Sequence, residues 1–173
     1  MSRRLSAGRG SSQVVLWSFP LSRKPFVLLN SKADENSPLV SPNGRWLAYL
    51  SDESGYWELY VQSFSSDGKL GTDRQRISDN GAFSPVWSRD GKEIFFIDRN
   101  RQMMATTVKT DGPQFEKTTP VALFKTRTVF QYGAFQEFDV TPDRQRFLIG
   151  TLIGDSKSAN PTVIVNWTAL LKK

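Results

Sequence analysis

The chain has 173 residues, of which 38% are hydrophobic and 12% aromatic, and it contains neither cysteine nor histidine. This length suits one domain that buries roughly 70% of the surface exposed by its unfolded chain. Without cysteine there is no disulfide, thiol nucleophile or zinc–thiolate site, and without histidine there is no serine–histidine or cysteine–histidine catalytic pair. We therefore expect a chain that is not an enzyme and that has no catalytic, cofactor-binding or metal-binding residues.

The net charge is +6, but the positive charge is concentrated in the two terminal segments. Residues 1–13 contain three arginines and no acid, the chain ends in two lysines, and the residues between carry a net charge of +1. Because nucleic-acid binding needs basic residues gathered on the folded body, we expect no nucleic-acid partner. We expect residues 1–13 to form a disordered basic tail.

The sequence contains no candidate membrane segment. No apolar run approaches the roughly 20 residues that span a bilayer. Residues 1–12 also lack the apolar centre of a signal peptide. We therefore predict neither a transmembrane helix nor a signal peptide in this chain.

Strand signals follow one another along the chain, whereas helical periodicity is hard to find. Short runs rich in Val, Ile, Phe, Tyr and Trp are bounded by Gly, Pro, Asn, Asp and Ser, as expected for strands joined by tight turns. In chain order, the predicted strands are 14–19, 24–29, 38–41, 45–51, 57–64, 75–78, 84–88, 93–98, 102–109, 121–124, 138–141, 146–152 and 161–167.

Three segments of the chain repeat one pattern: residues 41–49 (SPNGRWLAY), 88–96 (SRDGKEIFF) and 141–149 (TPDRQRFLI). Each begins with a hydroxyl residue, continues through a tight turn and ends in an apolar run. Gly44 and Gly91 stand 47 residues apart, and Arg144 occupies the matching position 53 residues further on. Four-stranded antiparallel sheets at a period of about 40–50 residues are typical of β-propeller blades.

The predicted fold class is therefore all-β: a partial β-propeller of about three four-stranded antiparallel blades, incomplete at both ends. Within the propeller fragment at residues 14–173, we expect a partial blade at 14–30, blades at 38–78 and 84–125, and a partial blade at 136–168. Four blades are about the fewest that close a ring. The chain is then a fragment of a longer protein, or two chains complete one ring as a homodimer, or the chain is poorly soluble alone.

The repeated turn resembles the Ser-Pro-Asp-Gly motif of the TolB-like, WD40-like (PD40) propeller repeat. Residues 41–49 carry it as Ser-Pro-Asn-Gly, residues 87–93 have Arg in place of Pro, and residues 141–143 are followed by Arg144 in the glycine position. Residues 164–173 (IVNWTALLKK) resemble the closing segment of propellers fused to bacterial serine/threonine protein kinases. The resemblance covers about residues 14–173.

This resemblance implies an extracytoplasmic or periplasmic sensor or scaffold, linked through a membrane helix to a kinase domain. Other relatives, of the prolyl-oligopeptidase type, carry a hydrolase domain after the propeller. The chain itself contains no kinase motif and no Gly-x-Ser-x-Gly elbow. We therefore expect a non-catalytic binding or scaffold module with a protein or peptide partner. The alternatives are the substrate-gating propeller of a hydrolase and a gene remnant without an independent role.

Several residues invite functional interpretations that structural roles explain better. Asp90 and Asp143 lie in the repeated turns, where short polar side chains bond their own backbone. The pair Asp52 and Glu53 is expected to be a solvated hairpin turn. The tryptophans are expected to pack between blades, with Trp57 the best candidate for ligand contact because it adjoins a turn. As the ligand surface we predict Asp52, Glu53, Tyr56, Trp57, Asn80 and Phe83.

Overall fold

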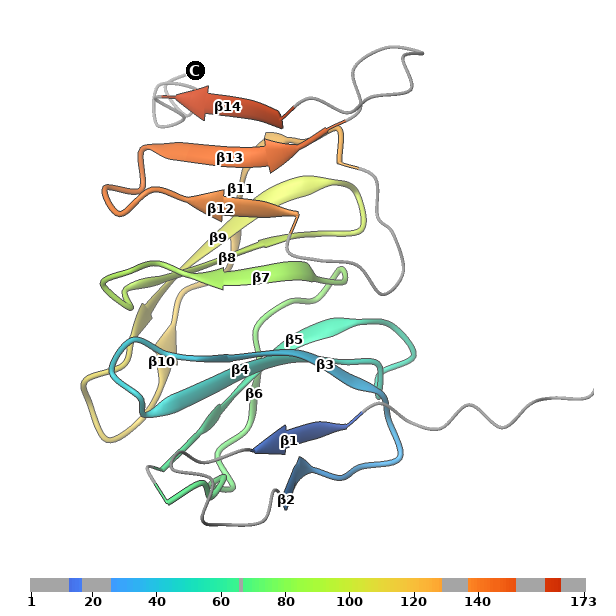
Figure 1. Cartoon of the computed structure of the whole chain (residues 1–173), viewed down its shortest axis with the longest axis vertical. Coiled ribbons are helices and arrows are strands. Elements are labelled where there is room, and N and C mark those ends of the chain that lie inside the picture. The colour runs from blue at the N-terminus through green and yellow to red at the C-terminus, as the bar shows by residue number, and fades with distance from the viewer. Residues whose placement is uncertain (1–12, 17–25, 66, 129–136, 152–160, 166–173) are drawn as a thin grey trace, which may run out of the picture.

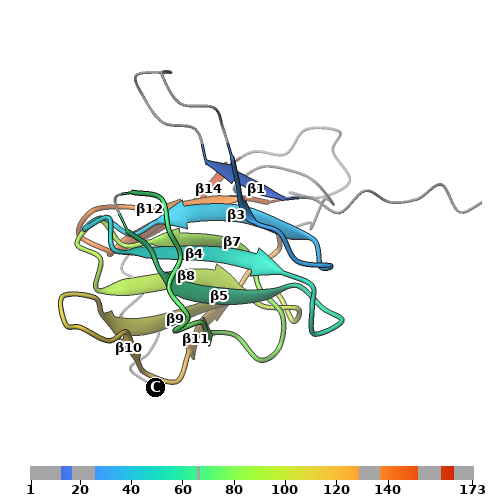
Figure 2. The ribbon, with the colours of Figure 1, turned by 90° about the horizontal axis from the view of Figure 1, so that it is seen from below.

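The chain is all-β in the computed structural model, as predicted (Figure 1). The structure describes residues 13–16, 26–65, 67–128, 137–151 and 161–165. Their strands form four antiparallel sheets that follow one another in chain order and pack face to face (Figures 1 and 2). In these ranges no helix is long and apolar enough to cross a membrane.

Three of the sheets have the consecutive strand order that the sequence predicts. The first pairs β1 (Val14–Leu16) with β2 (Phe26–Leu29). The second contains, in order, β3 (Glu35–Val40), β4 (Trp46–Ser51), β5 (Glu58–Ser63) and β6 (Gln75–Arg76). The fourth contains β12 (Phe138–Val140), β13 (Arg146–Gly150) and β14 (Pro161–Val165).

The third sheet has one strand more than predicted. After β7 (Phe83–Trp87), β8 (Glu93–Ile97) and β9 (Gln102–Lys109), two short strands pair with opposite ends of β9. β11 (Val121–Lys125) is the fourth strand predicted at 121–124, and β10 (Glu116–Lys117) is the additional one. Pro120 stands between these two strands and has no N–H for a sheet hydrogen bond, which explains the interruption.

The edge strand β3 begins at Glu35, three residues before the predicted start at Pro38. The predicted strand began at this proline. The observed strand begins earlier and passes the proline through a bulge. Ser37 takes a positive φ of 51° just before the proline, and Ser84 takes 49° before Pro85 at the equivalent bulge of β7. Both strands lie at sheet edges, where a bulge tolerates a residue without an N–H donor.

The three repeated turns share one hydrogen-bond network, which confirms their predicted structural role. In the second turn the Ser88 hydroxyl donates to Asp90 (2.7 Å) and accepts the Glu93 N–H (2.9 Å), while Asp90 also accepts the Lys92 N–H (3.2 Å). The glycine position has a positive φ in each turn, including 60° at Arg144. The same network is made by Ser41, Asn43, Arg45 and Trp46, and by Thr141, Asp143, Gln145 and Arg146.

Alternate side chains of the central strands pack against the sheets on either side. In β4, Trp46 and Ala48 contact the third sheet, whereas Leu47 and Tyr49 face the first sheet. In β8, Phe95 packs towards the fourth sheet. Burying a large side chain in this way contributes about 1.5–3 kcal/mol. The core between the second and third sheets comprises Trp46, Ala48, Leu50, Leu59, Val61, Ile77, Ala82, Ile94, Phe96, Val108 and Phe115, and that between the third and fourth comprises Val86, Phe95, Ile97, Met103, Ala105, Leu123, Phe138, Phe147 and Ile149.

The tryptophans that the structure describes pack between sheets, as predicted. Trp46 is buried, with its ring centroid 5.2 Å from that of Phe115, and its indole N–H donates to the Thr110 carbonyl (3.0 Å). Trp57 and Trp87 are half-buried against the same core. Trp17 and Trp167 lie outside the described residues, as does the predicted tail up to residue 12.

Candidate functional site

The two ends of the sheets differ in the segments that they carry. The turn end carries the repeated turns at residues 41–46, 88–93 and 141–146, which lie on the left in Figure 1. The tip end carries the hairpin tips at residues 52–57 and 98–101 and is on the right in Figure 1. The tip end also contains residues 78–82, which connect the second sheet to the third. All six predicted ligand residues lie at or beside the tip end.

An aromatic and a cationic side chain from neighbouring sheets meet at the tip end. Tyr56 is 57% exposed, and the Arg99 guanidinium lies 4.1 Å from the centre of its ring. The stem of Arg99 runs across Gly81, where an added Cβ would come within 2.4 Å of the arginine Cγ. Gly81 therefore provides the space in which Arg99 crosses to Tyr56. Such a cation–π pair contributes about 0.5–1 kcal/mol at an exposed site.

Asn80 joins this pair through two hydrogen bonds to the neighbouring hairpin. Its side-chain amide donates to Asp98 (3.0 Å), and its carbonyl accepts the Arg99 N–H (3.1 Å). The buried carboxylate of Glu58 accepts the Gly81 N–H (3.1 Å), which holds the connecting segment from the other side. The platform formed by Tyr56, Asn80 and Arg99 is therefore supported by both sheets.

Two further predicted residues lie close to this platform but are half-buried. The Trp57 carbonyl accepts the Ala82 N–H (2.8 Å), and the Trp57 side chain packs against the core between the second and third sheets. Phe83 begins β7 and pairs with Ile97, just before the hairpin tip. Both residues therefore support the platform and leave less of their own surface accessible to a ligand.

The two acidic residues of the predicted surface are turned towards other partners. Asp52 accepts the Asp34 N–H (2.9 Å), and Glu53 forms an ion pair of 2.6 Å with Arg74. The Arg74 guanidinium lies 3.9 Å from the ring centre of Tyr60, on the face of the second sheet that packs against the first. The two carboxylates therefore do not form a shared acidic site.

Burial raises the pKa of the nearby Tyr49 phenol to about 12, although the Arg74 cation acts in the opposite direction. Tyr49 and Tyr60 stack with ring centroids 6.0 Å apart. These contacts hold the Glu53 side of the hairpin against the first sheet, away from the platform. The structure thus gathers Tyr56, Trp57, Asn80 and Phe83 on one side of the hairpin and directs Glu53 to the other.

Sequence reasoning missed Arg99 and Arg74, the two residues that organise this region. Neither belongs to the repeated motif, and each meets its tyrosine only because neighbouring strands or sheets pack together. Arg99 lies in a predicted hairpin connection, but nothing local identifies Tyr56 as its partner.

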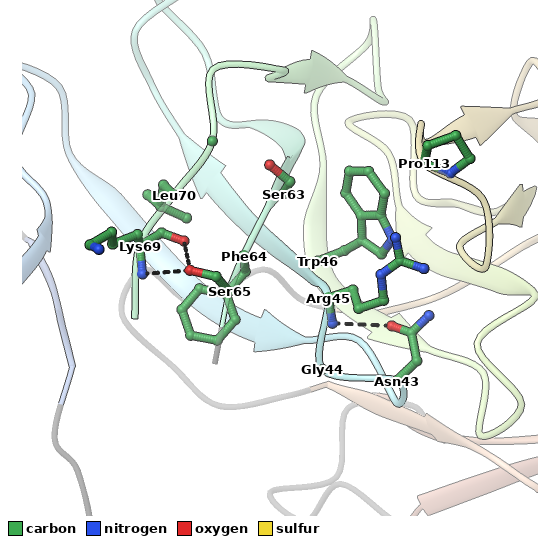
Figure 3. Close-up of a pocket in the computed structure, with 11 residues that line it drawn as sticks. Asn43, Gly44, Arg45, Trp46, Ser63, Phe64, Ser65, Lys69, Leu70 and Pro113 are labelled. Carbon is green, nitrogen blue, oxygen red and sulfur yellow. Dashed lines mark hydrogen bonds between the residues drawn. The ribbon is translucent and has the colours of Figure 1, made fainter. Parts of the chain in front are cut away.

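A pocket at the turn end, with a volume of about 640 Å³, was also not predicted (Figure 3). One wall is formed by the turn of the second sheet together with Pro113, and the other by the connection between β5 and β6. The pocket lies within the size range typical of small-molecule sites. Among the described residues, no group of three or more acidic side chains is arranged to hold a metal ion.

Comparisons with known proteins identify the fold. No family model and no curated protein matches the chain. A puromycin-hydrolysing peptidase of Mycobacterium tuberculosis is 19% identical, with a TM-score of 0.56 over 83% of this chain and 22% of the peptidase. A candidate TolB of Agrobacterium tumefaciens is 18% identical, with a TM-score of 0.56 over 93% of this chain and 55% of that protein.

The chain is a partial β-propeller. Its four consecutive sheets are blades, and its resemblance to TolB-like propellers is confirmed at the level of the fold. The propeller spans about a fifth of the length of the peptidase and about half that of the TolB. At this level of identity the likeness establishes the architecture, and function has to be argued from the residues.

Proposed function

We propose that this partial propeller is a non-catalytic binding module that recognises a protein or peptide at its tip end. The observation that carries the proposal is the exposed Tyr56 ring stacked under Arg99, with both residues on hairpins of packed blades. Tyrosine and arginine are enriched among residues that dominate protein interfaces, because they present large surfaces and directional donors. A rigid frame that displays loops is also the usual arrangement of a binding site.

Peptide binding by the purified full chain tests this proposal. Peptides selected from a displayed random library would be measured against the wild type, Tyr56→Ala and Arg99→Ala. We expect each substitution to weaken binding by at least about tenfold, since a central interface residue contributes roughly 2 kcal/mol or more. Val121→Ala is the matched control, because Val121 is also 57% exposed but lies in the outermost strand β11.

Two results would contradict the proposal. Failure of the folded chain to select any peptide would argue against a peptide-binding module. If the selected peptides bound Tyr56→Ala and Arg99→Ala as tightly as the control Val121→Ala, the binding surface would lie elsewhere. Circular dichroism of each variant would establish that the comparison is made between folded proteins.

For the wider context, we propose that the module belongs to a larger bacterial, kinase-linked protein outside the cytoplasm. This proposal is supported by the resemblance of residues 164–173 to the closing segment of kinase-fused propellers. The alternative is the substrate-gating propeller of a hydrolase, which is favoured by the similar fold within the puromycin-hydrolysing peptidase. Immunoblotting of the source cells, followed by mass spectrometry of the detected protein, would reveal a kinase domain or a hydrolase domain.

A second copy of the chain is the partner that we propose for the outermost blade faces. Val15 and Val27 pair with each other on the first blade and are each 43% exposed, and Leu148 is 49% exposed on the last. In β13, Leu148 lies between the buried residues Phe147 and Ile149, which pack against the third sheet. Leu148 is therefore on the opposite face of the last blade, where the next blade of a propeller would pack. Sedimentation should show a dimer that Leu148→Asp dissociates, and a wild-type monomer would contradict the proposal.

A further inference from the structure

The pocket at the turn end combines a fixed cation with apolar walls. Its lining includes Arg45 and Lys69 but no carboxylate, and its accessible apolar side chains are those of Phe64, Leu70 and Pro113, whereas the indole of Trp46 is buried behind the lining. Figure 3 shows Arg45, Trp46 and Pro113 on one side and Phe64, Lys69 and Leu70 on the other. This composition favours a ligand that has both an anionic group and an apolar body.

Arg45 is held in place by the neighbouring blade. Its two terminal nitrogens donate to the carbonyls of Asp111 (2.8 Å) and Gly112 (2.9 Å). A guanidinium carries five N–H groups, so these bonds leave three for a ligand. Because the two carbonyls fix the plane of the guanidinium, a bound carboxylate meets donors that are already oriented.

The opposite wall is also held in place, by contacts within its own blade. Phe64 and Leu70 form a β-bridge, and both pack against the core between the first and second sheets. The Ser65 N–H donates to the Lys69 carbonyl (2.9 Å). Apart from Pro113, both walls belong to the second sheet, in which the Phe64 N–H donates to the Arg45 carbonyl (2.8 Å). One wall is braced by the third sheet and the other by the first.

The charges of the lining favour a monoanion over a dianion. Lys69 forms an ion pair of 2.7 Å with Asp67, and this pair contributes no net charge. Arg45 is then the single uncompensated cation among the residues that line the pocket. One guanidinium matches one carboxylate in both charge and bidentate geometry.

We propose that this pocket binds an organic monocarboxylate with an apolar or aromatic body, its carboxylate on Arg45 and its body between Phe64, Leu70 and Pro113. The site lies at the end of the blades opposite to the Tyr56–Arg99 platform. It therefore does not depend on the proposed function at the tip end, and either site can fail its test without affecting the other.

The test is a titration of the full chain with 3-phenylpropanoate, followed by amide NMR. We expect saturable shifts of the Phe64, Leu70 and Gly71 amides. The neutral 3-phenylpropanamide has the same apolar body without the charge, and it should bind at least about tenfold more weakly, equivalent to about 1.4 kcal/mol at 25 °C. Inorganic phosphate should bind more weakly than 3-phenylpropanoate, because one guanidinium neutralises only one negative charge.

Substitutions then assign the cation. Arg45→Gln should weaken 3-phenylpropanoate binding by at least about tenfold, and Arg45→Lys should restore part of it, because lysine keeps the charge but not the planar donor pair. Arg89→Gln is the matched control, since Arg89 is exposed in the equivalent turn of the next blade and does not line the pocket.

Three results would overturn the inference: no saturable shift at the pocket amides, equal binding of the acid and its amide, or phosphate binding more tightly than the acid. Full affinity in a folded Arg45→Gln variant would also overturn it. If that variant does not fold, the wild-type comparison of acid, amide and phosphate still decides the matter.

Discussion

The turn end and the tip end of the partial propeller are built from opposite kinds of contact. At the turn end, three segments repeat one network of a hydroxyl, an acceptor side chain and backbone N–H groups. At the tip end, the contacts occur once each, as in the stacking of Arg99 on Tyr56 and the hydrogen bond from Asn80 to Asp98. A contact that is repeated in every blade stabilises the fold that the blades share. A contact that occurs once can differ between blades and can therefore contribute to recognition.

The turn end also links successive blades. Gly91 packs close to Pro42 of the preceding turn, where an added Cβ would lie 3.4 Å from the ring. Arg144 extends from the third turn towards Asp90 (3.5 Å) and Glu93 (3.2 Å) of the second. Substitutions in the repeated turn network should therefore reduce stability, and substitutions in the Tyr56–Arg99 platform should reduce the proposed peptide binding.

The largest expected effect comes from Trp46→Ala at the start of β4. The indole is buried against Phe115 and donates to the Thr110 carbonyl, so its removal leaves a cavity and breaks one of the two hydrogen bonds which that carbonyl accepts. We expect a loss of about 3–5 kcal/mol in the free energy of unfolding, measured by urea denaturation. Tyr56→Ala, the exposed aromatic at the tip end, should reduce stability by only about 0.5–1 kcal/mol, through the loss of its pairing with Arg99. Similar losses in the two variants would contradict the contrast between the ends.

Ser88→Ala tests the repeated turn directly. The hydroxyl is buried and accepts the Glu93 N–H, so its loss leaves a buried donor without a partner. The expected loss is about 1–3 kcal/mol in the same denaturation experiment. Ser54→Ala is the control at the tip end, where the hydroxyl makes one exposed hydrogen bond to the Tyr56 carbonyl. An unchanged midpoint for Ser88→Ala would show that the network does not stabilise the turn.

The smallest expected effect is the contribution of the Tyr56–Arg99 pair to stability. Two glycine substitutions separate this contribution from backbone strain. Gly55 and Gly81 both have a positive φ, but an added Cβ meets nothing at Gly55 and meets Arg99 at Gly81. Each alanine should cost about 1–2 kcal/mol of strain, and Gly81→Ala should lose roughly 0.5–1 kcal/mol more because Arg99 is displaced from Tyr56. In an Arg99→Ala background this additional loss should vanish, and its persistence there would assign it to another contact.

Local patterns were sufficient to predict most of the strands and the repeated turns. A turn such as 88–93 closes through bonds between residues five or fewer positions apart, so its residues are visible together in the sequence. The prediction was less accurate where a local rule had an exception. Pro38 was taken as the start of β3, which in fact begins at Glu35 and passes the proline through a bulge, and the short strand β10 was not predicted.

The sequence by itself determined a succession of antiparallel blades, because strand propensity and turn closure depend on neighbours along the chain. Only the tertiary structure decided that Arg99 crosses Gly81 to Tyr56, that Glu53 turns to Arg74, and that a pocket opens beside Arg45. These features join residues from different strands or blades, and their separation in the sequence leaves no periodic signal. Packing of whole sheets brings them together, so these contacts became visible only in the folded chain.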